Sequence, residues 1–231
     1  MRALSIIACV VMGACVAIPT APPTQQELKT AFTPTLDGRT AVRNFVRVVE
    51  TVEPVAERIC RQRAPAINCD FRIVVDDRRT SPPNAFQTID ANDRPIIAFT
   101  IPLIAIAQNR DELAFIMAHE AAHHIAGHIQ QARRNATLGA LILGSIVGVG
   151  DAEAQRTAQR IGATIGARTY SQDFELEADA LGAIIAQAAG YNAVRGAAFF
   201  SRLPSPDNRF LGSHPPNAKR IETVRRTVAG L

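Results

Sequence analysis

The sequence predicts an α+β fold that is mostly helical, with a small three-stranded sheet packed on one central helix. Apolar residues recur at helical spacing along much of the chain, first in Thr40–Arg63, where Pro54 predicts a kink or a restart. Three runs with the composition of short strands come before the central helix, at Phe71–Asp76, Asn84–Ile89 and Pro95–Thr100.

The central helix is predicted in Leu113–Gln131, which reads LAFIMAHEAAHHIAGHIQQ. Upstream, Asn109 and Glu112 have the spacing of a capping box, which fixes the start of a helix. Residues 136–150 are apolar and rich in glycine, which fits a buried hairpin, a flexible lid or a membrane-touching loop. Further helices are predicted at Asp151–Ala167, Gln172–Ala189 (ended by Gly190), Asn192–Leu203 and Asn217–Ala229.

The central helix contains the pattern H-E-x-x-H. His119 and His123 are four residues apart, so their imidazoles share one helix face and converge on one point. Neutral imidazole nitrogen is a ligand that Zn²⁺ accepts readily. Glu120 is then placed to reach a water at the metal without binding the metal itself. The pattern predicts a zinc hydrolase, against the alternative of a chance match on a structural helix.

Two more histidines follow, and we interpret both as structural or solvated. The H-x-x-G-x-x-H continuation of another zinc-protease pattern is absent, because Ala126 and Ile129 occupy its positions. On a continuing helix His128 would lie about 180° from His119, facing away from the metal. His124 is also assigned no metal role. A third ligand is therefore expected from elsewhere in the chain.

An acidic helix supplies the candidate for that ligand. Glu175 and Asp179 are four apart and share a helix face, whereas Glu177 points about 200° away from Glu175. Glu175 can complete a site of two histidines and one glutamate with an open fourth position. Asp179 is placed to hydrogen-bond a ligand imidazole from behind.

Length and composition narrow the class of protein. A chain of 231 residues, 47% of them hydrophobic, is long enough for one domain with appendages. Its net charge is only +4, and aromatic residues make up 5%. We find no basic patch interleaved with aromatic residues, so no nucleic-acid partner is predicted.

The N-terminus predicts export. Arg2 precedes an apolar run, and small residues lead to Cys15, as in a bacterial lipoprotein signal whose cysteine becomes lipidated. An ordinary cleaved signal and an uncleaved anchor are the alternatives. The predicted organisation is a signal peptide at 1–15, a tether at 16–39 and a metallopeptidase domain at 40–231.

Two cysteines remain for the folded part. Cys60 and Cys69 flank a turn-like segment and can form a disulfide in an oxidising compartment. The alternative is a pair of free buried thiols.

Together these motifs resemble the gluzincin zinc metallopeptidases of the CAAX prenyl protease and HtpX type. The resemblance extends from about Phe71 to Arg226 and implies a zincin-like fold, one Zn²⁺ per chain and endopeptidase activity. Because the chain lacks several membrane-spanning helices, it looks like the soluble periplasmic BepA-like branch. The matching segments are H-E-x-x-H, Glu175-Leu-Glu-Ala-Asp179 with Leu181-Gly182, Asn84-Ala85-Phe86, Arg110–Ala114, and His214-Pro215-Pro216 with Arg220.

The sequence also departs from that family. The glycine pair usual after the Asn-Ala-Phe strand is replaced by Gln87–Arg94, so the resemblance does not extend to the substrate-facing edge. No tetratricopeptide-like C-terminal region is present, so the partners of BepA are not carried over.

The expected function is a zinc-dependent endopeptidase of the bacterial envelope that cleaves unfolded or misassembled envelope proteins. It would be periplasmic and held to the outer membrane by lipid on Cys15, or soluble in the periplasm without that lipid. The alternative is a zinc-stabilised chaperone or binding module with negligible proteolysis. The oligomeric state is not predicted.

Two further residues receive catalytic roles from the resemblance. His214 or Arg220 would stabilise the oxyanion that forms on the cleaved carbonyl. His214 has a second interpretation, as a latch that takes the open position on zinc in the resting enzyme.

Overall fold

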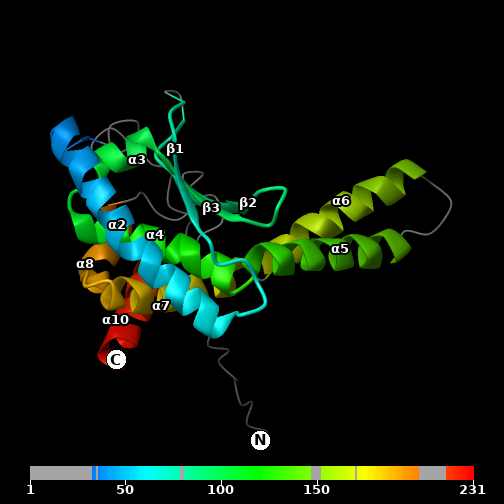
Figure 1. Cartoon of the computed structure of the whole chain (residues 1–231). Coiled ribbons are helices and arrows are strands. Elements are labelled where there is room, and N and C mark those ends of the chain that lie inside the picture. The colour runs from blue at the N-terminus through cyan, green and yellow to red at the C-terminus, as the bar shows by residue number, and fades with distance from the viewer. Residues whose placement is uncertain (1–32, 35, 79–80, 147–151, 170, 203–216) are drawn as a thin grey trace, which may run out of the picture.

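The computed structural model describes residues 33–34, 36–78, 81–146, 152–169, 171–202 and 217–231. The predicted signal at 1–15, with Cys15, and most of the tether at 16–39 lie outside the described residues. The fold class is confirmed: the chain is mostly helical, with one small three-stranded sheet (Figure 1).

Helix α2 (Gly38–Arg63) is the first element that the structure describes. The Asp37 carboxylate caps it by accepting a hydrogen bond from the Thr40 amide at 3.0 Å. The sequence predicts a kink or a restart at Pro54. The predicted restart was wrong, because the helix continues through Pro54 without interruption. Its buried stripe runs past the proline through Val52 and Ala56, and this packing outweighs the one backbone hydrogen bond that proline cannot donate.

The sheet has the strand order β1-β3-β2. Strand β3 (Pro95–Thr100) lies in the middle, parallel to β1 (Arg72–Asp76) and antiparallel to β2 (Ala85–Ile89). The central strand is mostly buried, which agrees with its apolar sequence. Strand β2 is an edge strand that contacts helix α4, so the sheet is packed on the H-E-x-x-H helix as predicted.

Helix α4 (Arg110–Ile125) follows the short helix α3 (Ile101–Ile106) and lies in the core of the domain. Fourteen of its sixteen residues are buried, so the helix lacks the broad solvent-exposed face of a typical surface helix. The predicted capping box is confirmed: the Asn109 side-chain oxygen accepts from the Glu112 amide at 3.1 Å, and Glu112 accepts from the Gln108 amide at 2.8 Å.

The predicted helix does not continue to Gln131. It ends at Ile125, and Gly127 adopts a left-handed backbone with φ of 68°. A new helix, α5 (His128–Ile146), then runs side by side with α6 (Ala152–Thr169), and Figure 1 shows this pair extending away from the body of the domain.

Helix α5 includes residues 136–146 of the apolar segment 136–150. Leu138, Leu141 and Ile142 of α5 are each more than half exposed, so a buried hairpin is wrong for the described part of that segment. The other two interpretations, a lid and a membrane-touching loop, stay predictions. No helix among the described residues is both long and apolar enough to cross a membrane.

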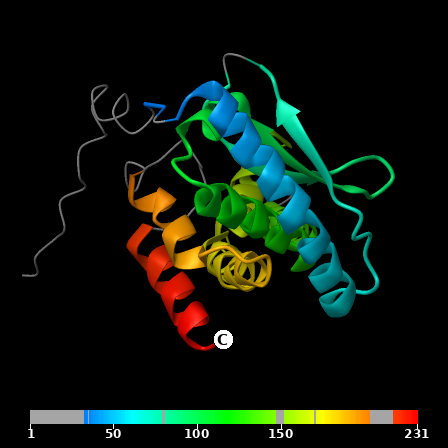
Figure 2. The same cartoon turned by 60° about the vertical axis from the view of Figure 1, so that its left-hand side comes forward.

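The remaining helices pack around α4. Helix α7 (Ser171–Ala188) makes its main contact with α4, and α8 (Ala193–Ala197) contacts the same helix. Gly190, with φ of 84°, follows the end of α7 as predicted. Helices α9 (Phe199–Arg202) and α10 (Asn217–Ala229) lie beside each other (Figure 2), and α10 also packs on α7.

The predicted disulfide between Cys60 and Cys69 is present, with 5.7 Å between the two Cα atoms. It joins the last turn of α2 to the segment that enters β1. The bridge therefore ties the long first helix to the sheet.

Candidate metal centre

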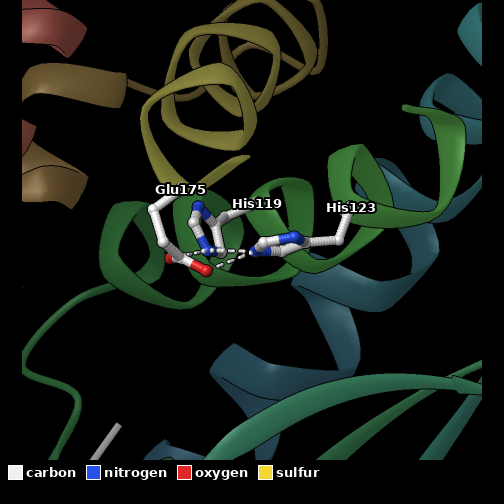
Figure 3. A group of neighbouring side chains, drawn as sticks. All are labelled: His119, His123 and Glu175. Carbon is white, nitrogen blue, oxygen red and sulfur yellow. Dashed lines mark hydrogen bonds and ion pairs between the residues drawn. The ribbon is translucent and has the colours of Figure 1, made fainter. Parts of the chain in front are cut away.

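Helix α4 places His119 and His123 on one face, as the four-residue spacing predicts. Figure 3 shows both imidazoles directed at the Glu175 carboxylate, which comes from α7. The two Nε2 atoms are 3.0 Å apart. Glu175 Oε2 lies 3.3 Å from His119 Nε2, and Glu175 Oε1 lies 3.2 Å from His123 Nε2.

The two helices reach this distance because α7 has a glycine where it crosses α4. A Cβ atom at Gly182 would lie 3.0 Å from both the backbone nitrogen and the Cα of His119. Any side chain there would therefore press on backbone atoms, which have little freedom to move. The absence of a side chain at Gly182 lets α7 bring Glu175 and Asp179 up to the histidines.

These three side chains fit zinc. Tetrahedral ligands held about 2.0–2.1 Å from Zn²⁺ lie roughly 3.3 Å from one another, close to the separations seen here. One atom from each of His119, His123 and Glu175 falls within 4.8 Å of the others. The side chain of His123 is 14% exposed, against 3% for His119, so the site opens on the His123 side.

Behind His119 lies a buried ion pair. His119 Nδ1 is 3.0 Å from Asp179 Oδ1, which places the carboxylate to accept that proton and turn Nε2 toward the metal site. Arg220 of α10 donates to the same carboxylate from Nε at 2.8 Å and from Nη2 at 2.6 Å. Its guanidinium also stacks on the Phe200 ring, 3.6 Å from the ring centre.

The charges of this group shift two pKa values. Burial alone would lower the pKa of His119, but its hydrogen bonds to Asp179 and Glu175 prevail and raise it to about 9 in the metal-free protein. Burial opposes ionisation of Asp179, yet the nearby Arg220 and His119 outweigh it and hold the pKa of that carboxyl below its usual range. Asp179 is therefore a permanent acceptor for His119.

Arg220 is almost completely buried, with 1% of its side chain exposed. Its Nη2 atom lies 3.9 Å from Glu175 Oε2, behind the metal ligands as seen from the open side. The geometry gives it a clear task as the partner of Asp179. Its predicted role in stabilising the oxyanion stays a prediction.

Glu120 lies next to His119 on α4 and is buried. Among the described residues, its carboxylate has no hydrogen-bond or ion-pair partner. A carboxylate without a protein partner beside a metal site is available to a water molecule or a substrate.

The prediction that His128 faces away from the metal was wrong. His128 Nδ1 lies 2.9 Å from His123 Nδ1, and His128 Nε2 lies 3.2 Å from Glu177 Oε2. The cause is the break at Gly127, which resets the helical phase before His128. Burial lowers the pKa of His128, and the neighbouring His123 acts in the same direction. The glycine directly before His128 is the sequence signal that would have predicted this.

His124 has the structural role that the sequence predicts. Its Nε2 donates to the Asn68 carbonyl at 2.7 Å, and its ring meets the Phe71 ring edge to face at 5.5 Å. Its Nδ1 faces the Gln87 side-chain nitrogen at 3.5 Å. His124 therefore joins α4 to strand β2 and to the segment next to the disulfide.

Two ion pairs fix the start of α4, and the sequence analysis did not predict either. Glu112 is paired with Arg202 of α9, with 2.8 Å between Oε2 and Nη2. Asp111 is paired with Arg195 of α8. Both acidic residues are buried, so each arginine compensates a carboxylate that is shielded from water. His214 and Cys15, which the sequence singles out, lie outside the described residues.

Comparison with known proteins agrees with this geometry. The model of one protein family, described as Peptidase family M48, matches residues 44–228, which is most of the chain. No curated protein matches the chain.

Proposed function

We propose, since the chain belongs to peptidase family M48, a family of metalloproteases, that it is a zinc-dependent endopeptidase. The observation that carries the proposal is the convergence of His119, His123 and Glu175 beside Glu120, a buried carboxylate with no hydrogen-bond or ion-pair partner in the part of the chain that the structure describes. Zinc, when bound, would polarise the peptide carbonyl and lower the pKa of a water molecule toward about 7.

The residues of this chain then have separate tasks. His119, His123 and Glu175 would hold the metal, and Asp179 with Arg220 keeps His119 in the orientation that binding needs. Glu120 accepts a proton from the attacking water and delivers it to the leaving amine. For the oxyanion we propose His214 as the donor, with Arg220 serving mainly Asp179.

An extended substrate would add to the edge of the sheet. Strand β2 pairs with β3 on one side, and no other strand of the described residues pairs with its outer edge. Its contact with α4 supports this edge as the one along which a peptide reaches the zinc ligands. The polar residue Gln87 stands where the family has its glycine pair, so backbone pairing rather than a glycine-lined groove is proposed to hold the substrate.

The proposed setting is the bacterial envelope. The predicted signal and Cys15, together with the Cys60–Cys69 disulfide, support an oxidising compartment and a lipid anchor in the outer membrane. Unfolded envelope proteins are the proposed substrates, because an edge strand recognises extended backbone rather than a particular sequence. A BepA-like branch of the family is consistent with this setting.

The second candidate function is a zinc-stabilised binding or chaperone module that does not cleave. A module of this kind needs the three metal ligands but has no use for Glu120. Glu120 is a buried carboxylate with no partner among the described residues, and burying such a group costs folding free energy, which favours the enzyme.

Replacing the general base tests the proposal. Glu120→Gln preserves the size of the side chain and should leave zinc binding unchanged. We expect cleavage of a dye-labelled unfolded protein to fall by about 10²–10⁴-fold. Glu222→Gln is the matched control, since this residue of α10 is exposed and its ion pair with Arg226 is long, at 3.8 Å. Zinc binding without cleavage in wild type, control and variant alike would favour the binding module.

A further inference from the structure

His128 lies between a proposed zinc ligand and an acidic residue. Its Nδ1 is 2.9 Å from His123 Nδ1, on the side of His123 that faces away from the metal site. Its Nε2 is 3.2 Å from Glu177 Oε2. The His128 side chain is 4% exposed, whereas that of Glu177 is 61% exposed, so the connection runs from the buried site to the surface.

These contacts determine where the protons lie. A carboxylate only accepts, so the nitrogen of His128 that faces Glu177 must carry a proton. In neutral His128 the other nitrogen, Nδ1, is then an acceptor. His123 Nδ1 must donate to it, which leaves the lone pair of His123 on Nε2, the atom that faces His119 and Glu175.

We propose that His128 is a positioning residue, which with Glu177 fixes the tautomer and the ring orientation of His123 for metal binding. The inference rests on the zinc site of the proposed function. In this arrangement each of the two ligand histidines is oriented by a carboxylate. Asp179 contacts His119 directly, whereas Glu177 acts on His123 through the imidazole of His128.

The three contributing residues come from three parts of the chain. His123 belongs to α4, His128 begins α5 and Glu177 belongs to α7. Helix α7 carries Glu175, Glu177 and Asp179 at alternate positions, so one helix provides a metal ligand and an orienting carboxylate for each histidine. Glu177 lies on a different face of α7 from Glu175, as the helical phase predicts, and from there it contacts His128 instead of the metal site.

A purely structural role for His128 makes a different prediction. Its ring stacks on Phe174, with 4.5 Å between ring centres and 14° between planes, so part of its contribution is packing. Packing depends on the ring but not on which nitrogen accepts a proton. Two variants that lose the ring equally, and differ only in the acceptor, separate these roles.

His128→Leu and His128→Asn form such a pair. Leucine and asparagine have similar size and branching, but only asparagine has an oxygen near the position of Nδ1. We expect the zinc dissociation constant, measured by competition with a chelator, to rise about 10–100-fold in His128→Leu. In His128→Asn the rise should be at most about threefold, because its side chain restores the acceptor for His123.

The carboxylate is tested with its own control. Glu177→Gln should weaken zinc binding by roughly two- to tenfold, less than His128→Leu because Glu177 is largely solvated. Asp173→Asn, an exposed residue of the same helix, makes the same change of charge and should leave zinc affinity unchanged. NMR of the zinc-loaded protein should show the proton of His128 on Nε2 and that of His123 on Nδ1.

Equal zinc affinity in His128→Leu and His128→Asn would overturn the proposal, as would a His128 protonated on Nδ1. These measurements do not depend on proteolysis. If wild type binds zinc but never cleaves, the proposed endopeptidase fails while the positioning role of His128 stands. If His128→Leu binds zinc as tightly as wild type, the positioning role fails and the endopeptidase does not.

Discussion

At the scale of single residues, the metal centre depends on side chains that never touch the metal. Asp179 is fully buried and would be costly as a lone charge, yet it must remain charged to orient His119. Arg220 makes this possible through its two hydrogen bonds to the carboxylate, and stacking on Phe200 holds the guanidinium in place. The arginine is therefore as necessary to the site as the carboxylate.

Removing that arginine should harm the protein more than removing the pair. Arg220→Met leaves the buried Asp179 with His119 as its one remaining charged partner among the described residues, and we expect the free energy of unfolding to fall by about 3 kcal/mol in urea titrations of the metal-free protein. The double variant Arg220→Met, Asp179→Asn should recover part of that loss, since no charge remains uncompensated. A double variant less stable than Arg220→Met would contradict this account.

At the scale of elements, α4 is a buried helix. Ion pairs fix its N-terminal turn, and α7 packs closely across it. The pairs Glu112–Arg202 and Asp111–Arg195 fix its first turn, and Gly182 sets how near α7 comes to His119. The positions of the ligand atoms therefore depend on how two helices pack, as well as on the spacing within each helix.

A side chain at the crossing should separate the two helices. Gly182→Ala places a Cβ against backbone atoms of His119, and we expect a loss of about 1–3 kcal/mol in stability together with weaker zinc binding. Gly38→Ala is the control, because nothing lies within 4 Å of a Cβ at that position of α2. Unchanged zinc affinity in Gly182→Ala would show that the distance between α4 and α7 is not critical.

The sequence predicts what depends on local periodicity. The three strands, the start of α4 and the shared face of Glu175 and Asp179 follow from patterns within a few residues, and all three agree with the structure. His128 was misplaced because one glycine resets the helical phase. The pairing of Asp179 with Arg220 was missed because the two residues are 41 positions apart, and helical or strand periodicity carries no information about contacts at that separation.

At the scale of the whole molecule, the disulfide and the predicted N-terminal signal favour the same compartment. The bridge between Cys60 and Cys69 lies next to Asn68, whose carbonyl holds His124 of the metal helix. By the loop-entropy model a bridge that closes a loop of this size contributes about 2–3 kcal/mol, which an oxidising compartment alone provides. The proposed export would thus contribute to the stability of the folded domain.

The mode of attachment can be tested apart from the chemistry. If lipid on Cys15 anchors the protein, Cys15→Ser should move it from the membrane fraction to the soluble or unprocessed fraction of the cell. Zinc content and cleavage by the purified domain should stay as in wild type, because Cys15 precedes every described element. A Cys15→Ser protein that stays in the membrane fraction after processing would exclude the lipid anchor.

Arg220, whose Nη2 atom also lies 3.3 Å from His119 Nδ1, is made late in the synthesis of the chain. The two residues are separated by 101 positions, with all of α5, α6 and α7 between them. A ribosome makes His119 and Glu120 long before it makes the arginine that compensates Asp179. A partly made chain would therefore hold the H-E-x-x-H motif before Glu175 is made, and the three ligands before the arginine that compensates Asp179, so the proposed zinc site would be completed late in synthesis.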